Sequence, residues 1–284
     1  MCIAILFHFH VVWSVTKKSI FSGNDGEDVI LWNKTILEDK DKKQKEVDDL
    51  NDSRIMSVSC LQYDDTIICF CSCSDGNVKC VQVPINVKTE FKSIPVTTKL
   101  EGVNHTVMQV RAFLTEPKNE KNIDVRVIGV TSNGKILIWR WHNGCEPVVK
   151  PVFSKDLRRS ALMCFDIVCK SKNVISIVIG GDDCSVSLWT FSEFKNGVFS
   201  IQNEWSQDQV QRSGVVNVKM CGDLVLSCSN DQIIACWDIL DGKLVWNIYA
   251  GVSDCQGFVP QIERKMALCF GNGIVAVSLP SVNV

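Results

Sequence analysis

The sequence predicts an all-β fold built from repeated antiparallel hairpins, and three observations support this prediction. Short apolar runs meet at small residues followed by a tight turn, as in residues 222–239, GDLVLSCSNDQIIACWDI, and this pattern is typical of a β-hairpin. The pattern recurs along the chain at a regular spacing. Several of its runs are continuously apolar, as expected for strands that are covered on both faces. Repeated sheets of this kind are typical of a β-propeller.

The second apolar run of each hairpin ends at an anchor position, which is a tryptophan or a valine. The six anchors are Trp32, Val81, Trp139, Trp189, Trp237 and Val277, with spacings of 49, 58, 50, 48 and 40 residues. A propeller blade repeats about every 40–45 residues, so the longer intervals are expected to carry loop insertions. Trp237 is followed by Asp238, the dipeptide typical of WD-repeat blades.

These anchors predict a single WD-repeat β-propeller over residues 1–284, with about six recognisable blades. An incomplete seven-bladed ring and a β-sandwich with similar hairpins are the alternatives. Residues 67–71, 125–130 and 175–179 are predicted as middle strands because their runs are apolar. The apolar start, residues 1–15, is also predicted as propeller strand, since it lacks the basic start and the cleavage site of a signal peptide and is too short to span a bilayer.

Composition excludes some functional classes. The 284 residues include 30 Lys and Arg against 32 Asp and Glu, a net charge of −2, which argues against nucleic-acid binding through the field of the whole chain. The 15 cysteines contain no C-x-x-C pair, and only four His accompany them. We therefore expect buried reduced thiols in a cytoplasmic protein, with disulfides and a metal site as the alternatives.

Residues 38–52, EDKDKKQKEVDDLND, are densely charged. Such a segment cannot bury apolar area, so it is predicted as a disordered, solvated loop between blades. The alternative is a partner-binding or modified segment.

Two sets of side chains are candidate site residues. His105, Thr131 and Trp139 occupy positions that in many blades form a hydrogen-bonded network; Trp32, Trp189, Trp237 and Asp238 hold the related anchor positions. We interpret this network as structural, because it satisfies buried polar groups. Lys155, Arg158 and Arg159 form a short basic run, which is interpreted either as an ordinary solvated loop or as a contact to tRNA phosphate or an acidic partner.

The search for chemistry favours a scaffold over an enzyme. The sequence has no phosphate-binding loop, no H-E-x-x-H and no G-x-S-x-G. Asp182-Asp183 and Asn230-Asp231 are predicted as turn residues, whose side chains bond their own backbone. We predict no catalytic residues, no metal, no cofactor, no membrane contact and no small-molecule substrate.

From about residue 100 onward, the order of segments resembles the C-terminal propeller of a large WD-repeat family. This family supplies the adaptor subunit of the tRNA ribose 2′-O-methyltransferase that acts at the wobble position of the anticodon. The matching segments are VMQVRAFLTEPKN, VTSNGKILIWRW, VIGGDDCSVSLWTFSE, VVNVKM, VLSCSNDQIIACWDI and VSDCQGFVPQIERKMALCFGNGIVAVSL. The last segment carries Asp254-Cys255, then Ala267-Leu268-Cys269 and Gly271-x-Gly273, which are similar to the final blade of that family.

The resemblance implies a non-enzymatic adaptor that holds a methyltransferase and presents tRNA. Family members are several times longer, so we expect this chain to be the C-terminal portion of a longer protein, in which tRNA binding lies mostly elsewhere. Residues 1–99 match less clearly. Two alternatives remain: a general interaction propeller, such as a ubiquitin-ligase substrate receptor or a trafficking adaptor, and a propeller enzyme with His and carboxylates that converge on a central channel.

Overall fold

The computed structural model describes residues 2–6, 11–15, 19–23, 29–33, 55–64, 66–84, 96–115, 123–171, 173–194, 198–208 and 211–280. The predicted charged loop, residues 38–52, lies outside this part. The chain divides into two compact units. The first comprises Met1–Thr131 and Ile136–Lys155, and the second comprises Ser132–Lys135 and Asp156–Val284.

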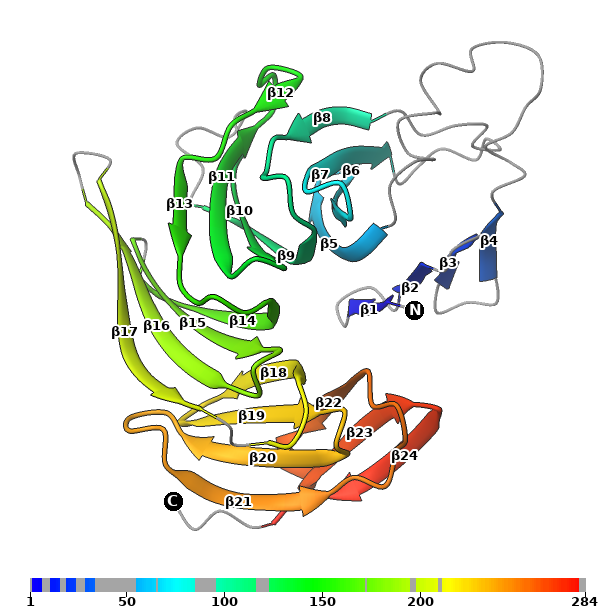
Figure 1. The fold of residues 1–284 in the computed structure, drawn as a ribbon. Coiled ribbons are helices and arrows are strands. Elements are labelled where there is room, and N and C mark those ends of the chain that lie inside the picture. The colour runs from blue at the N-terminus through cyan, green and yellow to red at the C-terminus, as the bar shows by residue number, and fades with distance from the viewer. Residues whose placement is uncertain are drawn as a thin grey trace. The chain divides into compact units, whose positions relative to one another are not determined.

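The first unit contains three sheets, built mainly from antiparallel strands that are neighbours in sequence (Figure 1). One sheet has the order β1-β2-β3-β4, with β1 Cys2–Leu6, β2 Val11–Val15, β3 Ser19–Gly23 and β4 Val29–Asn33. The second is formed by β5 Ile55–Tyr63, β6 Thr66–Cys73, β7 Val78–Pro84 and β8 Val96–Leu100, with β12 Val148–Val149 added in parallel to β8. The third is formed by β9 Val107–Leu114, β10 Asp124–Thr131, β11 Lys135–His142 and β13 Phe153–Asp156.

The second unit contains three further sheets. The first consists of β14 Leu162–Ser171, β15 Val174–Gly181, β16 Val186–Glu193 and β17 Phe199–Gln207. The next consists of β18 Val215–Cys221, β19 Leu224–Ser229, β20 Ile233–Asp238 and β21 Leu244–Tyr249. The last has three strands, β22 Gly257–Gln261, β23 Met266–Gly271 and β24 Gly273–Ser278.

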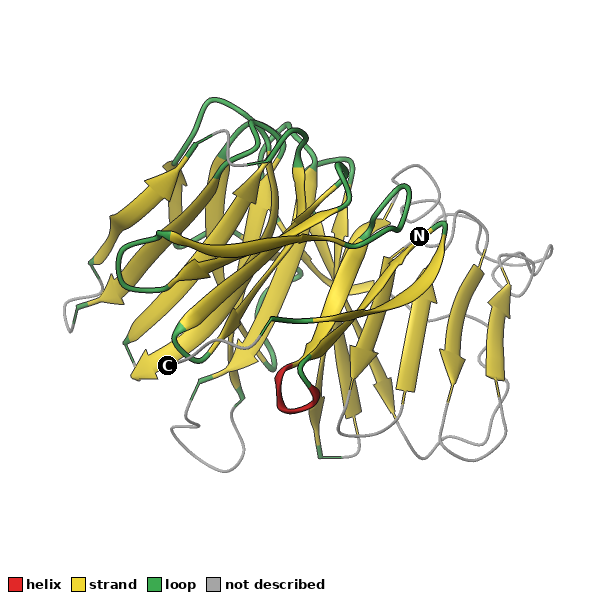
Figure 2. Cartoon of the chain, turned by 90° about the horizontal axis from the view of Figure 1, so that it is seen from below, coloured by secondary structure: helices red, strands yellow, loops and turns green. Residues whose placement is uncertain are grey.

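Strands and connecting loops make up nearly all of the described chain, as Figure 2 shows. The exception among the described residues is η2, a 3-10 turn over Ile262–Arg264. The described part contains no helix that is long and apolar enough to cross a membrane.

In four sheets the second strand is the most deeply buried, which confirms the interpretation of the apolar runs. β6, β10 and β15 are buried along nearly their whole length. Cys69, Cys71 and Cys73 are among the buried residues of β6, where they act as small hydrophobic side chains. These strands have neighbours on both sides in their own sheet, and their apolar side chains are removed from water on both faces of the sheet.

The sheets of each unit share irregularities at the same positions. The pairing of the first and second strands shifts by one residue near the start of the first strand, at Met56, Met108, Met163 and Val216. The pairing of the third and fourth strands shifts immediately before the anchor in three sheets, at Val81, Trp189 and Trp237. Because β-bulges re-aim side chains and increase twist, their repetition indicates that these sheets are copies of one structural unit.

Side chains on the first strand of one sheet accept hydrogen bonds from the first strand of the next sheet. In the first unit, the hydroxyls of Ser57 and Ser59 on β5 accept hydrogen bonds from the amides of Val110 and Ala112 on β9, at 3.1 and 2.9 Å. In the second unit, Asp166 on β14 accepts from the Lys219 ammonium and the Met220 amide, both at 3.1 Å. Apolar clusters between neighbouring sheets accompany these bonds.

The N-terminal sheet differs in one respect from the prediction. The apolar start of the chain is strand, as predicted, and Cys2–Leu6 forms a first strand that pairs with Val11–Val15. Trp32 therefore lies on β4, the fourth strand of its sheet, opposite Ile20 of β3. Trp139, Trp189 and Trp237 lie on third strands. The repeat pattern placed Trp32 on the third strand of its sheet, one strand too early, because an apolar run does not show its order among the strands.

Candidate functional site

The hairpin turns between second and third strands form a repeated polar structure. In four sheets, the residue just before the third strand or one position earlier has a positive φ; these residues are Gly76, Gly134, Cys184 and Gln232. In three of these turns an Asp accepts a hydrogen bond from a backbone amide two residues further on, as Asp75 does from Asn77 and Asp231 from Ile233, at 2.9 and 3.0 Å; the turn at Gly134 has Asn133 instead. Asp side chains commonly close tight turns in this way, so the Asp-containing turns are structural.

Glycine is required at Gly134, where φ is +83°. A Cβ built there would lie 2.0 Å from the carbonyl oxygen of Arg158. The close approach brings the loop before β14 onto the turn, where the carbonyl oxygen of Gly134 accepts from the amide of Leu157 at 2.9 Å. The carbonyl oxygen of Gln232 accepts from the amide of Ala250 in the same manner, at 2.7 Å. Each of these turns therefore holds the loop that leaves a sheet.

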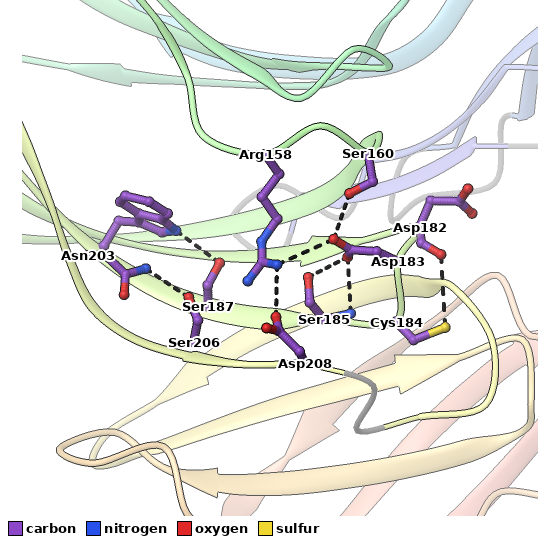
Figure 3. A network of polar contacts seen from close by, with 11 residues as sticks. Arg158, Ser160, Asp182, Asp183, Cys184, Ser185, Ser187, Asn203, Ser206 and Asp208 are labelled. Atoms are coloured by element: carbon purple, nitrogen blue, oxygen red, sulfur yellow. Dashed lines mark hydrogen bonds and ion pairs between the residues drawn. The ribbon is translucent and has the colours of Figure 1, made fainter.

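The most extensive polar network surrounds Asp183, in the turn between β15 and β16 (Figure 3). The hydroxyl of Ser160 donates to one carboxylate oxygen at 2.6 Å, and the hydroxyl and amide of Ser185 donate to the other. The guanidinium of Arg158 reaches Asp183 at 3.3 Å and Asp208 at 2.8 Å. Figure 3 shows Arg158 between the two carboxylates. Arg158, in the loop before β14, therefore holds both the turn between β15 and β16 and the segment after β17.

The carboxyl group of Asp183 is held in its ionised form. Partial burial alone raises its pKa, but the hydrogen bonds from Ser160 and Ser185 and the charge of Arg158 lower the pKa by more. The net pKa lies below the ordinary value of an aspartate. An aspartate that is ionised and saturated with donors accepts protons poorly, so this network fits loop fixation better than general acid or base catalysis.

The basic run predicted from the sequence divides into different environments. Arg158 has a side chain that is only 17% exposed, and its guanidinium is engaged by Asp183 and Asp208. Lys155, in the first unit, and Arg159, in the second, are exposed. The contact to phosphate or an acidic partner therefore stays a prediction for Lys155 and Arg159, whereas Arg158 serves an internal ion pair.

Both anchor tryptophans of the second unit, Trp189 and Trp237, bond a serine of their own sheet. The indole N–H of Trp237 donates to the hydroxyl of Ser227 on β19 at 3.0 Å, and that of Trp189 donates to Ser187 at 2.9 Å. Asp238, next to Trp237, accepts from the amide of Leu240 at 2.7 Å. This aspartate thus shapes the hairpin that leads from β20 to β21.

Trp139 makes a different bond from the one predicted. Its indole N–H donates to the carbonyl oxygen of Glu101 at 2.8 Å, whereas Thr131 was the predicted partner. Gly129 occupies the position that corresponds to Ser227, so no hydroxyl is available there. A Cβ at Gly129 would lie 3.0 Å from the Trp139 ring. The indole therefore packs on the glycine and turns to the backbone of the loop before β9.

The other two members of the predicted network lie in contrasting places. Thr131 is fully buried at the end of β10, and His105 is exposed. The loop that carries His105 is tied to the turn after β6 by its neighbour Thr106, whose hydroxyl donates to the carbonyl oxygen of Ser74 at 3.2 Å. Sequence reasoning chose His105 because histidine is frequent at this position, and it missed the hydroxyl beside it.

Sequence reasoning also missed Ser160, Ser185 and Asp208. Ser160 and Ser185 lie 23 and 2 residues from Asp183, and Asp208 lies 50 residues from Arg158. The repeat could have suggested Ser160, since it occupies the loop before a first strand, as Thr106 does. Within the described residues, no group of three or more His, Cys, Asp or Glu could hold a metal ion.

Comparison with known proteins identifies the fold. A chain in the crystal structure of the mitotic checkpoint complex is similar with a TM-score of 0.60 and 14% identity, covering 96% of this chain and 73% of that one. The WD40 β-propeller domain of Doa1 is similar with a TM-score of 0.59 and 13% identity, covering 99% and 82%. No protein-family model and no curated protein matches the sequence. Together with the repeated sheets, these similarities show that the chain has the WD40 β-propeller fold.

Proposed function

We propose that this chain is a non-catalytic scaffold and, more specifically, a cytoplasmic adaptor for the tRNA ribose 2′-O-methyltransferase of the wobble position. The WD40 fold supports a protein-interaction scaffold in general. The polar side chains of its turns favour this role. Asp75, Asp183, Asp231 and Asp238 hold backbone amides, hydroxyls or Arg158, so they fix loops that would otherwise be mobile.

The observation that carries the specific role is the ordered resemblance of the C-terminal segments. Residues that carry it also have a physical role in the last sheet. Cys255, Ala267 and Cys269 are fully buried, and Gly271 and Gly273 flank the turn between β23 and β24. The resemblance therefore rests on residues that determine how this sheet packs.

In this role the partner subunit binds the methyl donor and carries out the transfer. This chain contributes a rigid surface, and its exposed basic residues Lys155 and Arg159 are the candidates for contact with tRNA phosphate. Their contribution is expected to be modest and dependent on salt, because each phosphate contact releases counterions. Most of the tRNA affinity would come from the methyltransferase and from other parts of the complex.

The direct test is purification of the tagged chain from its own cells, followed by identification of bound proteins and measurement of wobble ribose methylation by mass spectrometry of tRNA digests. We expect a small methyltransferase to co-purify and the methylation to fall when the chain is depleted. The Lys155→Glu, Arg159→Glu double variant is then expressed in the depleted cells. If it restores wobble methylation, the two basic residues are not needed. Unchanged methylation after depletion would contradict the adaptor role.

A general interaction propeller is the second candidate function. It is favoured by the structural neighbours, because a WD40 domain of Doa1 and a chain of the mitotic checkpoint complex match this chain equally well. Under this alternative, purification would yield ubiquitin-ligase or coat components and no methyltransferase. The same experiment therefore separates the two functions.

A further inference from the structure

Two cysteines of the second sheet lie directly opposite each other on neighbouring strands. Cys60 of β5 is paired in register with Cys69 of β6, and their Sγ atoms are 3.1 Å apart, in a hydrogen-bond contact. Residues that are directly opposite in an antiparallel pair have Cβ atoms about 4.5–5.5 Å apart. A disulfide needs Cβ atoms about 3.5–4.5 Å apart, so a small adjustment of the two strands allows the sulfur atoms to bond.

The other cysteines of this sheet are placed differently. Cys71 lies two residues beyond Cys69 on β6 and is therefore diagonal to Cys60. Diagonal neighbours are about 7–8 Å apart, and Cα atoms more than about 7 Å apart cannot be bridged without backbone movement. Cys80 of β7 is opposite Phe70, so it lies on the other face of the sheet. The register therefore selects Cys69 as the disulfide partner of Cys60.

The two thiols differ in their access to solvent. Cys60 is partly exposed, whereas Cys69 is only 7% exposed. The hydrogen bond with Cys60, burial and the charge of the Cys60 thiolate raise the pKa of the Cys69 thiol well above its ordinary value. The thiolate is the reactive form of a cysteine. We therefore expect Cys60 to meet an oxidant first and Cys69 to act as the second, resolving thiol.

We propose that Cys60 and Cys69 form an oxidation site, at which a peroxide converts the two thiols into a reversible disulfide. The Cys60 thiolate attacks one oxygen of hydrogen peroxide and the O–O bond breaks. Cys60 becomes a sulfenic acid, and the departing hydroxide takes up the proton that Cys60 had lost, which gives water. The Cys69 sulfur then attacks the Cys60 sulfur and the S–O bond breaks. The proton of Cys69 leaves with the hydroxide as a second water. Two electrons pass from the thiols to the peroxide, and a reducing thiol reverses the reaction.

A second pair of thiols provides a comparison within the same chain. Cys228 of β19 and Cys255, in the loop before β22, have Sγ atoms 3.8 Å apart, and both residues are 0% exposed. We call them the buried pair. The hydrogen bond with Cys228 lowers the pKa of Cys255 to about 7, so this pair has thiolate character without access to solvent. The proposal predicts that the buried pair stays reduced in the folded chain.

The test is treatment of the full reduced chain with equimolar hydrogen peroxide, followed by alkylation in urea, cleavage with chymotrypsin and mass spectrometry. Cleavage after Tyr63 and Phe70 places Cys60, Cys69 and Cys71 on three different peptides. We expect the peptides of Cys60 and Cys69 to be linked, and the link to disappear after addition of dithiothreitol. The buried pair is expected to be alkylated in full. The absence of a link, a link from Cys60 to Cys71, or equal oxidation of the buried pair overturns the proposal.

Three variants test which thiol does what. Cys69→Ala removes the resolving thiol, so Cys60 is expected to remain a sulfenic acid, which dimedone labels. Cys60→Ser is expected to lose both the link and this label, because Cys69 is buried. Cys71→Ala is the matched control, since Cys71 is also buried on β6, and it is expected to retain the link. Circular dichroism checks that each variant is folded.

Two results with the variants would overturn the proposal. One is dimedone labelling of Cys69→Ala that is no greater than that of the parent chain. The other is oxidation of Cys69 that is undiminished in Cys60→Ser. The proposal does not depend on the adaptor role, which is tested by co-purification. If the chain forms the link but binds no methyltransferase, the oxidation site stands and the adaptor role fails.

Discussion

The sheets β18–β21 and β22–β24 are neighbours in the second unit, yet they differ in completeness. The third strand of the first, β20, is buried from Ile234 to Trp237, and its outer edge is covered by β21. The third strand of the second, β24, is exposed over most of its length. One apolar cluster joins the two sheets and includes Ile234, Phe258 and Cys269.

The difference shows which features of the repeat stabilise a sheet. β20 has its tryptophan anchor, the serine acceptor, the bulge and the fourth strand. β24 has Val277 at the anchor position, and Cys269 stands where β19 has Ser227. A sheet that lacks the tryptophan anchor and its serine acceptor is expected to contribute less to stability than its neighbour.

The largest expected effect is on the anchors. Trp237→Ala removes a buried ring that is 2% exposed and should lower the free energy of unfolding by about 3–5 kcal/mol. Val277→Ala, at the equivalent but half-buried position, should cost less than about 2 kcal/mol. Urea unfolding followed by circular dichroism measures both. Losses of equal size would mean that the two sheets are equally packed.

The next effect comes from the acceptor of the Trp237 indole. Ser227→Ala leaves this buried N–H without its partner and should cost about 1–3 kcal/mol. The matched change in the last sheet, Cys269→Ala, removes no acceptor from a tryptophan, so it should cost about 1 kcal/mol for the lost packing alone. The same unfolding assay checks both variants. A Ser227→Ala chain as stable as the parent would show that water or another group satisfies the indole.

The free energy of unfolding is expected to depend on pH through Asp183, in the turn of a four-stranded sheet. No such contribution is expected from Asn272, in the turn of the last sheet, because an asparagine does not titrate. The pKa of Asp183 is lowered in the folded chain, so its ionised form stabilises the fold above the ordinary aspartate pKa of about 3.9. This stabilisation is lost as the pH falls through the lower folded pKa. Asp183→Asn should therefore flatten the acid side of a stability curve measured from pH 7 downward. Parallel curves for Asp183→Asn and the parent would exclude this role of the carboxylate.

The smallest expected effect is that of Ile274→Lys on stability. Because this side chain is mostly exposed, the free energy of unfolding should change by no more than about 0.5 kcal/mol. Ile234→Lys would place a charge in the core of the neighbouring sheet and should prevent folding. Thermal melts of the two variants check this contrast. Strong destabilisation by Ile274→Lys would show that β24 is covered in solution.

Much of the repeat could be predicted from the sequence because its signals are local. The anchors Trp139, Trp189 and Trp237 lie on third strands, and the apolar runs at 67–71, 125–130 and 175–179 lie on buried second strands, as expected. Turn chemistry was equally accessible, since Asp231 closes its own turn. Each of these features depends on residues within one hairpin.

The remaining features depend on residues that are distant in sequence. The ion pair of Arg158 with Asp208 spans 50 residues, and the bond of Trp139 to Glu101 spans 38 residues. The bond of Trp139 could have been suspected, because Gly129 stands at the position of Ser227 and has no hydroxyl to accept from the indole. The exposure of β24 had no local sign, because GIVAVS has the composition of a strand whether its side chains are buried or exposed.

Hydrogen exchange of the full chain, resolved to single amides, tests most directly the claim that the last sheet is less well packed than the sheet before it. We expect slow exchange along β20, which is paired on both sides, and faster exchange along β24. Exchange that is as slow along β24 as along β20 would contradict the claim that the last sheet is less well packed.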